Sequence, residues 1–197
     1  MKLIFALVLA ITALSAQQQK RPESYWTEGL WQGYPGEWTH VSRQVLALAE
    51  TIPADKYTWR PELGVRSFSE VFMHIAVANF GLLAATGPRP PAGLRADMEK
   101  TVTDKAQVID WLTRSFDAVK AARSVVKHED FAKKTKFYGN EGTIDGMYMR
   151  IIVHANEHMG QLIAYARMAG AAPPWSAKAA NKRDNYNWSD ETSVCDR

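Results

Sequence analysis

Apolar residues recur at spacings of three and four along four long segments of the chain, which is the pattern of amphipathic helices. Each segment is long enough for a helix that buries one apolar stripe. The predicted helices cover residues 38–52, 67–86, 104–126 and 144–169. Strand patterns are almost absent, and only residues 136–138 are predicted to form a short extended piece.

The ends of these segments carry residues that begin and stop helices. Ser67 and Glu70 have the spacing of a capping box, in which each side chain binds the other residue's backbone N–H. Asp104 is a suitable N-cap for the third helix. Pro53 stops the first helix and the Gly87-Pro88 pair stops the second. The helix boundaries therefore agree with the apolar periodicity.

Four helices with one apolar stripe each pack most simply as a four-helix bundle, so we expect an all-α fold. The long connections between the helices imply at least one crossover. A β-sandwich or a Rossmann fold would need strands that the sequence lacks. We expect the bundle domain to cover residues 37–176, after a lead-in segment over 17–36 and before a polar tail over 177–197.

The first 16 residues have the pattern of a secretory signal peptide. The basic start Met1-Lys2 is followed by an apolar run over 3–14 and by the small residues Ser15-Ala16. The run is short for a membrane span, which needs about 20 residues. We expect cleavage after Ala16, hence an exported protein, periplasmic or secreted, with no stable membrane association afterwards. The alternative is an uncleaved N-terminal anchor.

The composition excludes several classes of protein. Of the 197 residues, 46% are hydrophobic and 23% are charged, as in an average soluble globular protein. The net charge is only +3, and the basic residues are scattered, so nucleic-acid binding is not expected. Cys195 is the only cysteine, which rules out a disulfide within the chain.

The histidines carry the candidate chemistry. His154 and His158 are four residues apart in the longest helix, so they project from one face, which Gln161 and Tyr165 continue. His74 lies near the middle of the second helix. Imidazoles in a bundle core need polar partners, and three that converge are readily satisfied by a divalent cation. Three nitrogen ligands leave coordination positions open, as in reactive sites. The alternative is that these histidines make ordinary hydrogen bonds.

A second motif overlaps the histidine pair. Residues 154–158 also spell H-x-x-E-H, the inverted zinc-protease signature, in which Glu157 would be the general base. That architecture needs a further acidic ligand on another helix downstream, and the acids after His158 lie in the polar tail. A position of Glu157 facing a neighbouring helix or solvent is therefore favoured.

Three stretches of the sequence resemble the DinB/YfiT-like superfamily of metal-binding four-helix bundles. They are Tyr57-x-Trp59-x-Pro61…Gly64-x-x-Ser67, Glu70-x-x-x-His74-Ile75 and His154-x-x-x-His158-x-Gly160-Gln161-Leu162…Arg167-x-x-Gly170…Pro173-Pro174. The resemblance runs from about residue 38 to residue 176. Its most specific part is the Gly-Gln pair after the second histidine of the last motif.

The resemblance implies a ligand set and a partner. In that family three histidines bind a divalent metal, zinc or nickel, and they map onto His74, His154 and His158. His40 and His128 match no ligand of the family, and we interpret them as a helix-flank and a loop residue. Gln161 is expected to hydrogen-bond a ligand or a backbone group, and Tyr165 to border or fill the pocket. Dimerisation is common for such bundles, which makes a homodimer an expectation from the resemblance.

Two kinds of function follow from the resemblance. Some relatives are thiol-dependent transferases, in which the metal lowers the pKa of a small thiol. Export argues against this chemistry, because exported compartments are oxidising and poor in free thiols. Metal-dependent hydrolysis of a small-molecule substrate needs only water and meets no such objection. The alternatives are a non-catalytic metal- or ligand-binding module and a structural bundle without metal.

Overall fold

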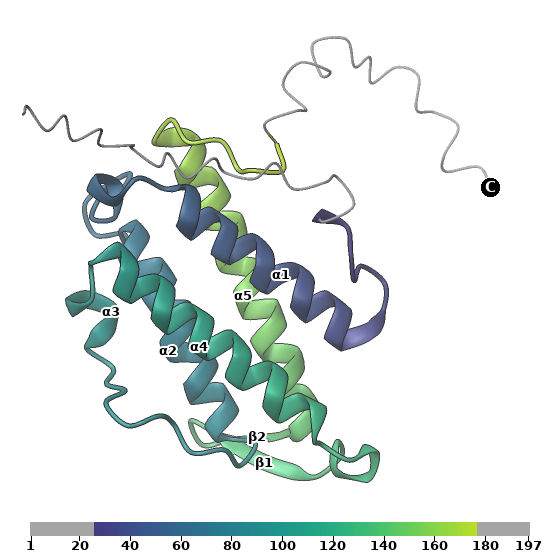
Figure 1. The fold of residues 1–197 in the computed structure, drawn as a ribbon. Coiled ribbons are helices and arrows are strands. Elements are labelled where there is room, and N and C mark those ends of the chain that lie inside the picture. Colours follow the sequence, from purple (N-terminus) through teal and green to yellow (C-terminus); the bar gives the residue numbers. More distant parts are fainter. Residues whose placement is uncertain (1–25, 177–197) are drawn as a thin grey trace, which may run out of the picture.

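The computed structural model describes residues 26–176 and is mostly helical (Figure 1). The predicted signal peptide, the first part of the lead-in segment and the polar tail lie outside the described residues, as does Cys195. Within residues 26–176, no helix combines the length and the apolar character needed to cross a membrane.

All four predicted long helices are confirmed. They are α1 (Gly33–Thr51), α2 (Phe68–Ala84), α4 (Lys105–Ser124) and α5 (Ile144–Met168). Helix α1 begins five residues before the predicted start, and its first turn includes Pro35. Proline is tolerated there because the backbone N–H groups of a first turn have no partner within the helix. The apolar periodicity starts only at Trp38, so it did not reveal this turn.

Short elements occupy the connections. The helix α3 (Met98–Thr101) lies before α4, and the 3-10 turns η2 (Ala54–Lys56) and η3 (His128–Asp130) follow α1 and α4. The strands β1 (Lys134–Phe137) and β2 (Asn140–Thr143) form an antiparallel hairpin in which Lys134 faces Thr143. The predicted extended piece is thus one part of a hairpin.

The hairpin was missed because of its turn. Tyr138 and Gly139 both have positive φ angles, 48° and 80°, as in the two-residue turn that suits the twist of antiparallel strands. Asparagine or aspartate is the usual first residue of such a turn, whereas tyrosine seldom adopts a positive φ. The sequence therefore lacked the ordinary signal for a hairpin at this point.

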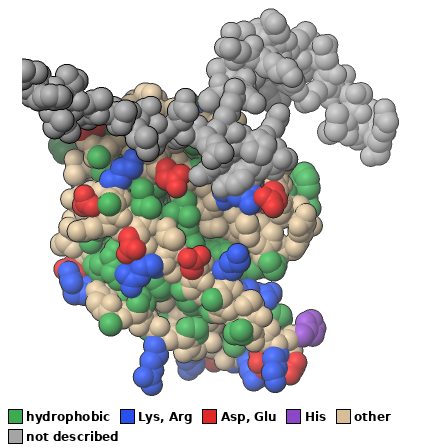
Figure 2. Space-filling model, viewed as in Figure 1, with side chains coloured by type: hydrophobic (Ala, Val, Ile, Leu, Met, Phe, Trp, Pro, Cys, Tyr) green, Lys and Arg blue, Asp and Glu red, His purple; other side chains and the backbone are tan. Residues whose placement is uncertain are grey.

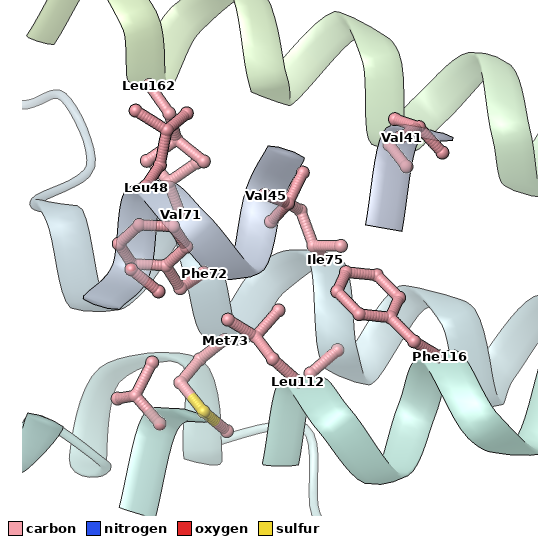
Figure 3. Close-up of a cluster of buried hydrophobic side chains, with 14 of the residues drawn as sticks. Val41, Val45, Leu48, Val71, Phe72, Met73, Ile75, Leu112, Phe116 and Leu162 are labelled. Atoms are coloured by element: carbon pink, nitrogen blue, oxygen red, sulfur yellow. The ribbon is translucent and has the colours of Figure 1, made fainter. Parts of the chain in front are cut away.

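The long helices enclose one apolar core. Helix α1 contacts α4 and α5, and helix α2 contacts the same two helices (Figure 1). Of the consecutive long helices, α2 and α4 pack closely, whereas α1 and α2, like α4 and α5, are not main neighbours, in agreement with the crossover that the long connections implied. Side chains of all four helices meet in the core, among them Leu48, Phe72, Leu112 and Leu162 (Figure 3). Burying a side chain of this size stabilises the fold by about 1.5–3 kcal/mol.

Two buried polar groups in this core have partners on neighbouring elements. The Trp38 Nε1 atom donates to the Phe116 carbonyl over 3.2 Å, and the Tyr57 hydroxyl donates to the Ala49 carbonyl over 2.7 Å.

Where the described chain begins and ends, the rings of Trp26 and Trp175 contact each other, with centroids 5.4 Å apart. On the surface viewed in Figure 2, acidic and basic side chains are interspersed.

The predicted caps are confirmed. At the start of α2, the Glu70 backbone N–H donates to the Ser67 hydroxyl over 3.3 Å, and the Ser67 backbone N–H donates to the Glu70 carboxylate over 2.6 Å. Asp104 accepts from the Gln107 backbone N–H at the start of α4. These bonds satisfy donors that a helix cannot pair internally. They therefore help to set where α2, the helix that carries His74, begins.

Replacing Ser67 by alanine is expected to destabilise the protein by about 1 kcal/mol, because the first turn of α2 loses its hydroxyl acceptor. Urea unfolding with an unchanged slope measures this loss. Ser124→Ala is the matched control, since its exposed hydroxyl donates to the Ala121 carbonyl at the far end of a helix. The control is expected to stay within about 0.5 kcal/mol of the unmodified protein. Equal losses in both variants would contradict a specific role for the capping box.

Candidate metal centre

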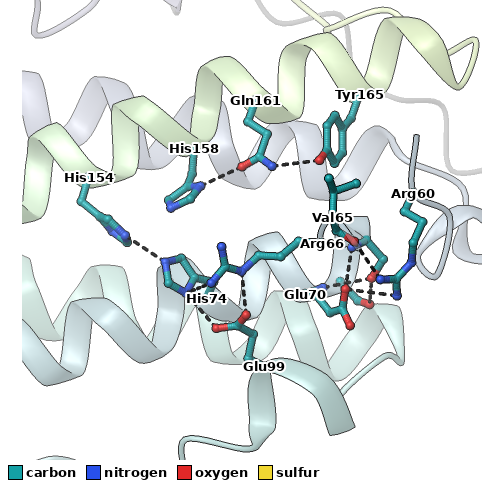
Figure 4. A network of polar contacts seen from close by, with 12 residues as sticks. Arg60, Val65, Arg66, Glu70, His74, Glu99, His154, His158, Gln161 and Tyr165 are labelled. Carbon is teal, nitrogen blue, oxygen red and sulfur yellow. Dashed lines mark hydrogen bonds and ion pairs between the residues drawn. The ribbon is translucent and has the colours of Figure 1, made fainter. Parts of the chain in front are cut away.

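Three histidines from two neighbouring helices meet at one point (Figure 4). His74 comes from α2, and His154 and His158 lie one turn apart on α5, the helix against which α2 packs. One nitrogen of each ring lies within 4.8 Å of the nitrogens of the other two. Among the described residues, no other group of three or more His, Cys, Asp or Glu side chains comes together in this way.

The three rings are in direct contact. The Nε2 atoms of His74 and His154 are 3.1 Å apart. The centroid of the His158 ring is 4.7 Å from that of His74 and 4.6 Å from that of His154. A divalent ion with three imidazole ligands requires nitrogens gathered around a single position, and the described geometry provides such a set.

The outer nitrogen of His74 is held by a carboxylate. Its Nδ1 atom lies 2.8 Å from Glu99 Oε2, on α3, and the other oxygen of Glu99 accepts from Arg66 Nε over 2.6 Å. These contacts assign the proton of His74 to Nδ1, which leaves the lone pair of Nε2 directed at the other histidines. A carboxylate in this place fixes the ring and makes its other nitrogen a better ligand.

The outer nitrogen of His158 is held by an amide. Its Nδ1 atom lies 2.9 Å from Gln161 Oε1, and Gln161 Nε2 donates to the Tyr165 hydroxyl over 2.9 Å. This chain of hydrogen bonds runs along one face of α5, as the spacing in the sequence suggested. It assigns the proton of His158 to Nδ1 as well. Two of the three rings therefore present an Nε2 lone pair to the same position.

His154 differs from the other two histidines. Its Nδ1 atom is buried and has no hydrogen-bond partner among the described residues. Burial, followed by repulsion from His158 and His74, lowers its pKa from the ordinary 6.5 to about 4. Burial also lowers the pKa of His158, partly offset by its bond with Gln161. Both rings are thus neutral at pH 7, which is the state that binds a metal ion.

The other candidate residues are not part of the histidine cluster. Glu157 is exposed on α5, and its carboxylate accepts two hydrogen bonds from Arg150, the shorter over 2.7 Å. That bond lowers the pKa of Glu157. His128 is exposed in η3, as expected for a loop residue. His40 lies on α1, and burial lowers its pKa.

Glu99 and Arg66 are site residues that the sequence did not indicate. Glu99 lies 25 positions after His74, at the end of an irregular connection, and Arg66 precedes the cap of α2. Neither residue is part of the apolar periodicity of a predicted helix, and neither has a sequence spacing from the histidines that is typical of metal ligands. A search for a carboxylate near His74 would have met many candidates, because the path of the connection decides which one reaches the ring.

The donor set fits a divalent ion such as zinc or nickel. All three groups are imidazoles, which suit both metals, and two of them are oriented by polar partners. Glu99 and Glu157 are each engaged with an arginine and are not part of the ligand group. Three protein donors leave room for an exchangeable ligand.

A mostly helical fold with three clustered histidines defines a class of candidate metal-binding helical proteins. Within this class the family can be identified from the sequence. The sequence pattern of the DinB superfamily matches residues 37–162, and the chain belongs to that superfamily.

Comparison of structures gives the same fold. A DinB-like protein from Bacillus cereus ATCC 10987, whose crystal structure is known at 2.01 Å resolution, superimposes with a TM-score of 0.65. The two sequences are 21% identical, and the match covers 73% of this chain and 95% of the other. No curated protein matches this sequence significantly.

Acid is expected to destabilise the metal-free protein through His154. Because the folded pKa of about 4 is below the ordinary 6.5, the unfolded chain binds the proton more readily. The contribution of neutral His154 to the free energy of unfolding is therefore complete above pH 6.5 and is lost as the pH falls towards 4. The loss is on the order of 2 kcal/mol.

Urea unfolding in the presence of a chelator, between pH 7.5 and pH 4.5, measures this dependence. His154→Gln should show a shallower loss of stability on acidification, with a remainder that reflects His158. His128→Gln, which changes an exposed histidine, should follow the unmodified protein. Identical pH dependence in His154→Gln and the unmodified protein would contradict the assignment.

Proposed function

We propose that this protein is a four-helix bundle of the DinB type that binds one divalent metal ion through His74, His154 and His158. The observation that carries the proposal is the convergence of one nitrogen from each ring within 4.8 Å. The neutral state of His154 and His158 supports it, since a ligand nitrogen must be unprotonated. Zinc and nickel are the ions that the imidazole set and the family resemblance favour.

We further propose that the centre acts as a metal-dependent hydrolase or thiol-dependent transferase on a small molecule. A divalent ion held by neutral ligands keeps its full charge and lowers the pKa of a bound water or thiol. The role of the chain is then to position this centre: Glu99 and Gln161 hold the outer nitrogens of two rings. Tyr165 continues the hydrogen-bond chain from Gln161.

A non-catalytic binding module is the second candidate. The observation that favours it is that Glu99 and Glu157, the carboxylates around the cluster, are each paired with an arginine. A general base needs a free carboxylate or imidazole within reach of the proton it removes. If the metal alone activates its ligand, no such base is needed, and the catalytic proposal remains the stronger one.

Metal analysis tests the centre directly. The chain from Gln17 onward, purified without a histidine tag and supplied with zinc or nickel, is expected to hold about one ion per chain. His154→Ala should lose it, because two imidazoles remain. His128→Ala is the control, since it removes an exposed histidine outside the cluster, and it should keep the ion. Absence of metal from the unmodified protein after zinc and nickel are added would overturn the proposal.

We also propose export, with the product located in the periplasm or secreted, on the basis of the signal-peptide pattern in residues 1–16. An exported location favours hydrolysis over thiol transfer, because free thiols are scarce there. Expression of the chain as printed, followed by mass measurement of the protein outside the cytoplasm, should find a product that begins at Gln17. A full-length product retained in the cell would contradict this proposal.

A further inference from the structure

A guanidinium group lies directly beside the histidine cluster. Arg66 Nη2 is 3.3 Å from His74 Nδ1, and Arg66 Nε donates to Glu99. Because Nδ1 and Nε2 are on opposite sides of the imidazole ring, Arg66 flanks His74 on the side away from His154 (Figure 4). The positive charge thus lies one ring away from the position where the three nitrogens converge.

The position of this guanidinium is well restrained. Glu99 uses one oxygen for Arg66 and the other for His74, so the arginine and the histidine share one carboxylate. The neighbouring backbone is also held: Arg60 donates to the Val65 carbonyl over 2.7 Å and pairs with Glu70 over 3.1 Å. A ligand that binds Arg66 would therefore meet a group that is already oriented, which reduces the entropy lost on binding.

Arg66 also has a donor to spare. Its side chain is 40% exposed, so a small molecule can reach it. Arg66 donates to Glu99 through Nε, its Nη2 atom lies beside the protonated Nδ1 of His74, and no acceptor within residues 26–176 contacts Nη1. A guanidinium has five N–H donors in a fixed plane, and those on Nη1 are suited to a carboxylate.

The charges around the cluster favour an anionic ligand. Arg66 is balanced by Glu99, and Arg150 by Glu157. Since imidazoles bind a metal in their neutral form, these described groups would leave the charge of a divalent ion uncompensated. A ligand that brings negative charge to the metal and to Arg66 would supply that compensation.

We propose that Arg66 Nη1 is a carboxylate-binding subsite next to the metal centre. The substrate class is then a small carboxylic acid that reaches the metal through one end and Arg66 through its carboxylate. A single guanidinium already paired with Glu99 suits a singly charged carboxylate better than a dianionic phosphate. This inference rests on the proposed metal centre and adds to it a determinant of substrate choice.

Binding of two matched probes tests the subsite. The probes are 3-mercaptopropionate and its amide, which share a thiol that binds the metal and differ only in the carboxylate. The protein is loaded with cobalt, whose visible and near-ultraviolet absorption reports thiolate binding without any assay of activity. The unmodified protein is expected to bind the carboxylate probe about tenfold more tightly than the amide, the effect of one exposed charge-assisted contact.

Three variants separate the subsite from a general charge effect. Arg66→Gln should lose the preference while it binds the amide as before. Arg66→Lys keeps a charge beside Glu99 and should retain cobalt and part of the preference. Arg150→Gln is the matched control, because it removes another paired arginine near the cluster, and it should keep the full preference.

Each contrary result has a distinct meaning. A preference that survives in Arg66→Gln shows that the carboxylate binds the metal itself and overturns the subsite. If Arg150→Gln loses the preference for the carboxylate probe to the same extent, the effect comes from the overall positive charge around the cluster, and the subsite is also overturned. Loss of cobalt in both Arg66 variants assigns Arg66 to holding Glu99 and His74 instead. Failure of the unmodified protein to bind cobalt overturns the metal centre, and the subsite with it.

Discussion

The packing of α2 against α5 is the constraint on which the rest of the site depends. It places His74 beside His154 and His158, which the helical repeat of α5 by itself brings onto one face. The pair is present in any helical form of this segment, but the third nitrogen arrives only when the apolar faces of the two helices are buried together. A small displacement of α2 along α5 would separate nitrogens that must lie within a few ångströms. The packing of the apolar core therefore also fixes the relative positions of the three histidines.

Glu99 links this centre to a part of the fold that contributes little to the core. It lies on the four-residue helix α3, within the connection between α2 and α4, yet its carboxylate holds both His74 and Arg66. Met98, the buried residue beside it, anchors that connection to the core. The connection thus has a defined position where the site needs one, although most of its residues are exposed.

The sequence predicted those features that depend on local spacing. The helices, the capping box of Ser67 and Glu70, and the choice of His74, His154 and His158 follow from periodicity, cap chemistry and the family motifs. The features that it did not predict depend on the path of the chain. Glu99 reaches His74 only because of how the connection runs, and the hairpin turn at Tyr138 uses a backbone conformation that tyrosine seldom adopts. Local rules cannot supply such information.

The contact between Trp26 and Trp175 has a consequence for the connectivity of the fold. It brings the two ends of the described chain to the same place, so the path through the helices is nearly a closed loop. A closed loop can in principle be opened elsewhere without changing the packing. The exposed turn at Tyr138 and Gly139 lies in the hairpin before α5 and is such a place. A chain joined at its present ends and opened at this turn would therefore have a different order of helices in the sequence but the same arrangement of helices around the core.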